Sequence, residues 1–242
     1  MTLQTRCLGL DPELVDYAEA LELQRMLHAE VLAGRAPSTL LMLEHADVYT
    51  AGKRTEPADR PKDGTPVIDV DRGGKITWHG RGQLVGYPII RLRDRALVKD
   101  YVCAMEGALI TVLAEDFGIT GRRVEGRSGV WITDGATEKK IAAVGIRVHQ
   151  SVTTHGFALN CSNDLSPFEN IIACGIADAG TTTITAELGR TVTPADVVER
   201  VTAQMKQSLL PFTSAAPQSA LGEDVDVVSA CNTSQPKEGI PS

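Results

Sequence analysis

Residues 128–162, SGVWITDGATEKKIAAVGIRVHQSVTTHGFALNCS, are predicted to form three consecutive strands, the first two joined by the polar turn DGATEK. Residues 65–92 predict three further strands separated by glycine-rich turns, and a buried strand opens residues 38–52. Helices are predicted before, between and after these strands. This order of elements favours an α+β fold, a mostly antiparallel mixed sheet flanked by helices.

The helices follow from apolar residues spaced three and four positions apart. Asp11 and Pro12 provide a cap and a first turn for the first helix, which Gly34 ends. The second helix is expected over residues 98–119 and the last over residues 193–212.

The last thirty or so residues of the chain differ in composition from the rest. Residues 213–242 are polar, acidic and free of aromatic side chains. Such a segment buries too little apolar surface to offset the entropy lost on ordering. We therefore expect one folded domain over residues 1–212 and a disordered tail over residues 213–242.

The composition argues against several classes of function. Lys and Arg number 24 against 31 Asp and Glu, and the resulting net charge of −7 argues against nucleic acid as a partner. No apolar run approaches the length that spans a bilayer, and the N-terminus lacks the pattern of a signal peptide. We therefore expect a cytoplasmic protein with no membrane partner.

The motifs for metals and nucleotides are also missing from the sequence. The five cysteines form no CxxC pair, which argues against a thiolate zinc site. The glycines of GRGQLVG, residues 80–86, do not have the spacing of the dinucleotide fingerprint, and no P-loop sequence occurs. We expect neither a metal nor a cofactor.

Gly73 and Gly74 permit two interpretations. They can form a simple hairpin turn between two strands. Alternatively, together with the glycines that follow, they can form one wall of a groove that a ligand approaches closely, with His79 at its opening.

Cys174 lies between an apolar run and a glycine, so it is either a small core residue or a nucleophile. A thiolate needs a neighbouring cation, for which Lys140, His79 and His155 are candidates. Lys139 and Lys140 point to opposite faces if both lie in a strand, so that one faces solvent and the other the covered side. The residues alone leave open both a solvated lysine pair and a thiol enzyme.

These segments also resemble a known family, the lipoyl(octanoyl) transferases. The similar blocks stand in the expected order between about residues 40 and 190: LEHADVYTAGKRT (43–55), RGGKITWHGRGQLVGYPI (72–89), KIAAVGIRV (140–148), THGFALN (154–160), ACGI (173–176) and TITAELGR (183–190). Arg81 departs from the pattern, because the family commonly has proline there. The arginine leaves the loop freer and either faces water or meets an acidic carrier protein.

The resemblance implies a fold similar to the catalytic domain of biotin and lipoate protein ligases. It implies transfer of an octanoyl group from octanoyl-acyl carrier protein to a specific lysine of a lipoyl domain. Such domains belong to 2-oxoacid dehydrogenases and to the glycine cleavage H protein. We expect the enzyme to be a monomer.

The resemblance also implies roles for individual residues. Cys174 matches the nucleophile that carries the acyl group as a thioester, and Lys140 matches the lysine that lowers the pKa of that thiol and shuttles protons. The residues that match the walls of the acyl-binding site are Arg72, Gly73, Gly74, Lys75, Ile76, Thr77, Trp78, His79, Ala143, Val144, Gly145, Gly156, Phe157 and Ala158. We expect the floor that measures chain length beneath Ile76 and Trp78 or their neighbours.

Other functions compete with this one. The chain can be an ATP-dependent lipoate or biotin protein ligase of the same fold, or an amidotransferase that moves octanoyl between lipoyl-domain proteins. A non-catalytic acyl-binding protein is a third alternative. A cysteine hydrolase ranks last, because no Cys-His family signature occurs.

Overall fold

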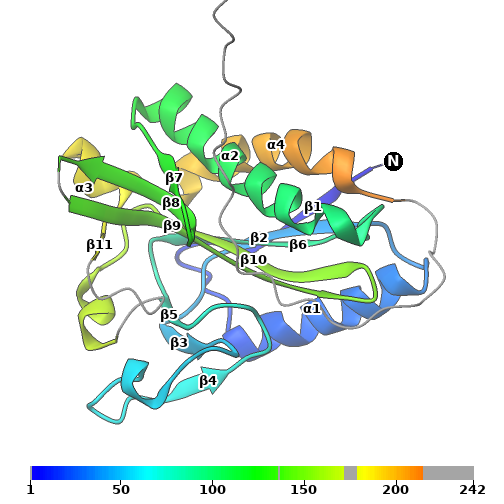
Figure 1. The fold of residues 1–242 in the computed structure, drawn as a ribbon, viewed down its shortest axis with the longest axis horizontal. Helices are drawn as coiled ribbons and strands as arrows, with labels where there is room; N and C mark the ends of the chain where they lie inside the picture. Colours follow the sequence, from blue (N-terminus) through cyan, green and yellow to red (C-terminus); the bar gives the residue numbers. More distant parts are fainter. Residues whose placement is uncertain (1, 136, 172–178, 215–242) are drawn as a thin grey trace, which may run out of the picture.

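The structure is a computed structural model that describes residues 2–135, 137–171 and 179–214. Its main element is an eight-stranded sheet with the order β1-β2-β6-β10-β9-β8-β7, in which β11 also pairs with β9 (Figure 1). In that order the strands are β1 (Gln4–Gly9), β2 (Thr39–Leu43), β6 (Gln83–Ile89), β10 (Val152–Asn160), β9 (Thr137–His149), β8 (Arg127–Asp134), β7 (Arg122–Val124) and β11 (Gly180–Thr181).

The main sheet is mixed. Two of its pairs, β1 with β2 and β11 with β9, are parallel. The other pairs are antiparallel, and short turns join three of them, β7 with β8, β8 with β9 and β9 with β10. The predicted α+β class with a mostly antiparallel sheet flanked by helices is therefore confirmed.

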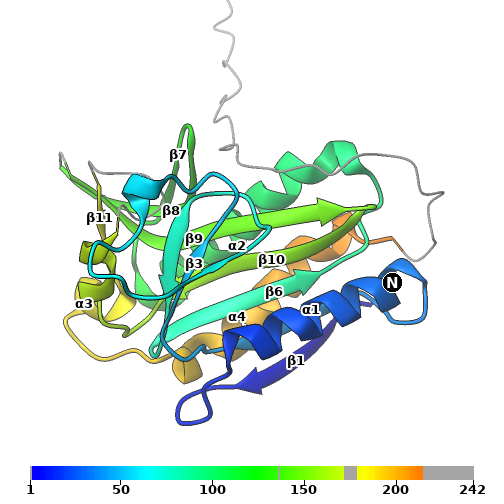
Figure 2. The same ribbon diagram turned by 90° about the horizontal axis from the view of Figure 1, so that it is seen from below.

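Helices cover both faces of this sheet. Figure 1 shows α2 and α4 on one face and α1 on the other, and Figure 2 shows α1 lying along β1 and β6. Their bounds are α1 (Tyr17–Leu32), α2 (Val98–Phe117), α3 (Ile184–Leu188) and α4 (Pro194–Leu209). Short 3₁₀ turns lie at Pro57–Asp59, Arg95–Leu97, Ser166–Asn170 and Leu210–Phe212.

Alternation along the strands divides the core into two layers. In β2, Leu40 and Met42 pack in the cluster beneath α2 and α4, whereas Leu41 and Leu43 pack in the cluster beneath α1. A strand with both faces buried needs apolar residues at every position, and for that reason residues 40–43 are continuously apolar.

A second, three-stranded sheet lies beside the α1 face of the main sheet, with the order β4-β3-β5 (Figure 1). Its strands are β3 (Val48–Ala51), β4 (Val67–Asp69) and β5 (Ile76–His79). Both β4 and β5 pair with β3 and not with each other. The hairpin-turn interpretation of Gly73 and Gly74 is therefore wrong, because the strand on either side of them pairs with β3 instead.

The first helix begins later than predicted. Asp16, not Asp11, is its N-cap and accepts hydrogen bonds from the Ala18 and Glu19 amides at 2.8 and 3.1 Å. The residues before it are drawn into pairing with the strand end at 44–46, where the Val15 amide donates to the Glu44 carbonyl at 2.9 Å. This pairing between distant parts of the chain outweighs the local tendency of Asp11 and Pro12 to begin a helix.

Helices α2 and α4 agree closely with the predicted ranges, whereas the short helix α3 was not predicted. Helix α2 ends at Gly118, which has the left-handed φ of +65° that a C-terminal glycine supplies. Helix α4 starts with a capping box between Thr193 and Asp196. The Ser214 amide still donates to the Arg91 carbonyl at 2.8 Å, and so contact with the folded part continues just beyond residue 212. Within the ranges that the structure describes, no helix is long and apolar enough to cross a membrane.

Candidate active site

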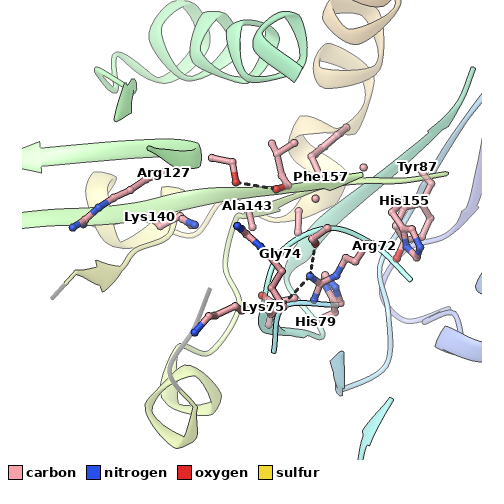
Figure 3. A pocket seen from close by; sticks show the side chains of 18 of the residues that line it. Arg72, Gly74, Lys75, His79, Tyr87, Arg127, Lys140, Ala143, His155 and Phe157 are labelled. Carbon is pink, nitrogen blue, oxygen red and sulfur yellow. Dashed lines mark hydrogen bonds between the residues drawn. The ribbon is translucent and has the colours of Figure 1, made fainter. Parts of the chain in front are cut away.

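A cavity of about 250 Å³ lies between the middle of the main sheet and the loop that leads into β5 (Figure 3). Most of the residues predicted from the resemblance meet around it. Those that line it are Arg72, Gly73, Gly74, Lys75, Thr77, His79, Lys140, Ala143, Val144, Gly145, Gly156, Phe157 and Ala158. The sequence analysis did not predict these further lining residues: Tyr17, Arg54, Tyr87, Gly126, Arg127 and Ser128.

Ile76 and Trp78 do not line this cavity. Side chains alternate along a strand, so Thr77 and His79 face the cavity while Ile76 and Trp78 face the other way. Ile76 and Trp78 pack with Tyr49 in the core of the small sheet. Ile76 and Trp78, which were predicted as wall and floor of an acyl-binding site, therefore do not contribute to the lining of this cavity.

Small residues from two paired strands form the cavity wall. Ala143 of β9 lies opposite Ala158 of β10, and Gly145 lies opposite Gly156. A Cβ atom on Gly145 would lie 3.2 Å from the Gly73 carbonyl oxygen, so this glycine lets the loop approach the sheet. A Cβ atom on Gly156 would lie 2.1 Å from the carbonyl oxygen of Gly86, so here the glycine lets two strands pack closely.

The guanidinium of Arg72 holds the loop in shape. It is 8% exposed and donates to the carbonyls of Gly73 and Lys75 at 3.0 and 2.8 Å. A further bond of 2.8 Å reaches the Thr50 carbonyl in β3. Gly74 has a φ of +90°, which suits glycine and allows the loop to fold around this side chain.

Asp71 fixes the start of the same loop to the main sheet. Its carboxylate is 2.8 Å from Nε2 of His155 and also pairs with Arg147. The hydrogen bond from His155 holds the pKa of Asp71 well below its usual range. His155 itself is 2% exposed with a φ of +58°, an unfavourable conformation that the surrounding contacts maintain. His155 therefore anchors the loop, and burial lowers its pKa.

Buried aromatic and imidazole rings lie at one end of the cavity, where Tyr17, His79 and Tyr87 line it and His45 lies behind them. The ring of Tyr17 stacks on His79, with centroids 6.1 Å apart, and Nε2 of His45 lies 2.8 Å from the Tyr87 hydroxyl. Burial lowers the pKa of His79 to about 3 and of His45 to about 4, and raises that of Tyr17 to about 12. These groups are uncharged near neutral pH. His79, at 7% exposure, is a buried wall residue and does not stand at an opening.

Lys140 lies toward the opposite end of the cavity from Tyr87 and His155 (Figure 3). It is 9% exposed, and its ammonium nitrogen is 4.6 Å from the centroid of the Trp131 ring. Lys139 lines neither this cavity nor the smaller one beside it, as expected for neighbours on opposite faces.

Cys174 lies outside the described residues. Described residues on both sides of it in the sequence lie near Lys140: Phe168, Ala179 and Thr181 line a small cavity of about 30 Å³ that Lys140 also lines. Thr181 pairs directly with Lys140 in the β11–β9 ladder.

Arg81 is the position at which the sequence departs from the family pattern. Its side chain is 62% exposed and pairs with the Asp11 carboxylate at 2.5 Å. It lies outside the lining of the main cavity, so its local role is a surface ion pair.

The mixed sheet with its flanking helices recurs in solved structures. A bipartite lipoate protein ligase from Thermoplasma acidophilum superposes with a TM-score of 0.62 at 16% identity, covering 87% of this chain and 84% of that one. A lipoate-protein ligase A bound with ATP gives a TM-score of 0.60 at 13% identity, covering 87% and 86%. A biotin protein ligase from Aquifex aeolicus gives 0.50 at 15%, covering 88% and 71%. The fold is thus that of the catalytic domains of these ligases.

Sequence comparison narrows this class. Residues 16–206 match the model of the lipoyl protein ligase A/B catalytic domain. An octanoyltransferase of Leifsonia xyli is 59% identical over 217 residues, which cover 89% of this chain and 96% of that protein. An octanoyltransferase of Pseudarthrobacter chlorophenolicus is 54% identical over 223 residues, covering 91% and 100%. The chain belongs to the octanoyltransferase family of acyltransferases.

Proposed function

We propose that the chain transfers an octanoyl group from octanoyl-acyl carrier protein to a lysine of a lipoyl domain through a thioester on Cys174. The observation that carries this proposal is the cavity with small-residue walls that has Lys140 at one end, in a chain 54–59% identical to octanoyltransferases. The acceptors we propose are the lipoyl domains of 2-oxoacid dehydrogenases and the glycine cleavage H protein. Since both carriers are soluble proteins, we propose the cytoplasm as the compartment of the reaction.

In the first half of the reaction, the Cys174 thiol gives its proton to the Lys140 amine. The thiolate attacks the thioester carbonyl of the donor, and the carrier sulfur leaves and takes the proton back from Lys140. One thioester replaces another, so little free energy changes and no ATP is needed. Backbone amides near Gly145 and Cys174 are the donors we assign to the tetrahedral oxyanion.

In the second half, the amine of the lipoyl-domain lysine attacks the enzyme thioester. Lys140 accepts a proton from that amine, an amide forms, and the Cys174 sulfur leaves as a thiolate that regains a proton from Lys140. Conversion of a thioester into an amide makes this half favourable.

The cavity supplies binding energy for the acyl chain. An octanoyl group presents seven CH₂ and CH₃ groups, and burial of each is worth about 0.8 kcal/mol, or about 5 kcal/mol together. The rings of Tyr17, His79 and Tyr87, which we assign to the end that holds the terminal methyl group, are uncharged near neutral pH.

The competing ligase and amidotransferase functions are separated by one transfer assay. Octanoyl-acyl carrier protein, an apo lipoyl domain and the enzyme are mixed without ATP, and the mass of the lipoyl domain is followed. We expect octanoylation with the parent enzyme and none with Cys174→Ser or Lys140→Ala. Lys139→Ala is the matched control and retains activity, because Lys139 lines neither cavity. Transfer that requires ATP, or that survives Cys174→Ser, would show the proposal to be wrong. An octanoyl-lipoyl domain offered as a competing donor tests the amidotransferase alternative.

A further inference from the structure

Trp131 of β8 forms the floor beneath the Lys140 ammonium. The Lys140 nitrogen lies 4.6 Å from the ring centroid, within the range of a cation–π interaction. The ring is 1% exposed, and its Nε1 donates to the Arg127 carbonyl at 3.2 Å, which fixes its orientation. An ammonium taken out of water needs such a partner, because burial alone disfavours its charged form.

We propose that Trp131 is a positioning residue for the reaction, which holds the Lys140 ammonium charged and at the end of the acyl cavity by offering it the face of its ring. This inference rests on the role proposed above for Lys140. It concerns a residue outside the lining of the main cavity, since Trp131 lines the small cavity beside it, which Lys140 also lines.

A β-bulge is what places Trp131 against Lys140. Val130 pairs with Ala142, so an uninterrupted antiparallel register would put Trp131 opposite Ile141. The register instead shifts between Val130 and Trp131, and Trp131 lies opposite Lys140. Residues directly opposite each other in a sheet share a face, so the bulge is what brings the ring and the ammonium together.

A buried carboxylate stabilises the strand next to this bulge. Gly129 has a φ of +111°, and a Cβ atom there would lie 2.3 Å from the Ala142 carbonyl oxygen, so only glycine fits. Its amide donates to Oε1 of Glu106 in α2 at 2.7 Å. Glu106 is 1% exposed, and its other oxygen is 3.3 Å from Nε of Arg123. Contacts among α2, β8 and β9 therefore fix the backbone of β8 next to the bulge that places the Trp131 ring opposite Lys140.

Other charged groups lie around the pair in the part of the chain that the structure describes. They are Arg127 of β8, at 5.8 Å from the ring centroid, Glu138 of β9, which pairs with Arg127, Glu106 of α2, and Arg72 and Lys75 of the loop before β5, which line the main cavity with Lys140. The anionic groups in this set, Glu138 and Glu106, are each paired with an arginine. The aromatic face is accordingly the partner that we assign to Lys140.

The test compares substitutions at Trp131 by the rate at which iodoacetamide alkylates Cys174 between pH 5 and 10, read by peptide mass spectrometry. Trp131→Phe keeps an aromatic face and Trp131→Leu removes it, while both lose the Nε1–H donor. We expect Trp131→Leu to slow alkylation at pH 7 about five- to thirtyfold and to raise the pH of half-maximal rate by about one unit. Trp131→Phe should restore most of the rate.

Fluorinated tryptophan incorporated at residue 131 provides a second measurement in which the shape is kept. Each added fluorine weakens the negative face of the ring, so the alkylation rate at pH 7 should fall stepwise. An unchanged pH profile in Trp131→Leu and across the fluorinated series, with Lys140→Ala still slow, would overturn this inference alone. Normal alkylation in Lys140→Ala would overturn the proposed role of the lysine and this inference with it.

Discussion

Ala143→Leu tests whether the cavity measures the acyl chain. The Ala143 methyl group projects from β9 into the cavity, opposite Ala158, so a leucine side chain adds three carbon atoms to the space we assign to the acyl chain. If three methylene groups of an octanoyl chain are displaced, about 2.4 kcal/mol of burial is lost at about 0.8 kcal/mol each. That loss lowers kcat/KM for octanoyl-carrier protein about fiftyfold, whereas shorter chains still fit.

The assay is a competition among butanoyl-, hexanoyl- and octanoyl-carrier proteins, with the acylated lipoyl domains counted by mass. We expect the preference of Ala143→Leu to move to the shorter chains. Ala18→Leu, on the exposed side of α1, is the matched control and should keep the octanoyl preference. Unchanged selectivity and kcat/KM in Ala143→Leu would refute the assignment of this cavity to the acyl chain.

Three further predictions concern stability. Gly156→Ala places a Cβ atom 2.1 Å from a backbone oxygen of β6, so we expect a loss of about 1–3 kcal/mol, measured by thermal and urea unfolding. His45 and His79 stay neutral in the folded state, with pKa values lowered to about 4 and about 3, while the unfolded chain takes up protons below about pH 6.5. The free energy of unfolding should therefore fall from pH 7 to pH 4, and a flat profile would contradict this. The lowered pKa of Asp71 gives a linkage of the same sign in a lower pH range: its contribution to stability is present above about pH 4 and is lost on further acidification. The stability difference between the parent and Asp71→Asn should therefore vanish at low pH, and a difference that persists there would contradict the linkage.

Much of the fold follows from local sequence signals. Helices α2 and α4 were predicted nearly to their ends because apolar spacing and caps agree, with Gly118 and Thr193 at the ends. The predicted start of α1 was wrong. Asp11 is a residue type that often caps helices, but residues before Asp16 pair with the strand end at 44–46 through Val15, so the helix begins only after Asp16. Strand β1 was not predicted, because an edge strand with mostly exposed residues lacks apolar alternation.

The lining of the cavity could be predicted only in part from sequence segments that resemble a family. The block that contains β5 was assigned to the acyl wall as a unit, but the strand period of two sends only Thr77 and His79 to the cavity. Tyr17 and Tyr87 come from a helix and a strand far apart in the sequence, and each fits a core pattern, so no local signal marks them as cavity residues. The bulge that pairs Trp131 with Lys140 is likewise a tertiary feature.

The central claim is that Cys174 carries the octanoyl group between the two carriers. Rapid-quench intact-mass measurement, with enzyme and octanoyl-carrier protein but no acceptor, tests it most directly. We expect one octanoyl adduct per enzyme, mapped to Cys174, formed within the turnover time and discharged when an apo lipoyl domain is added. Full transfer without any such adduct, or an adduct that the acceptor does not discharge, would contradict the account.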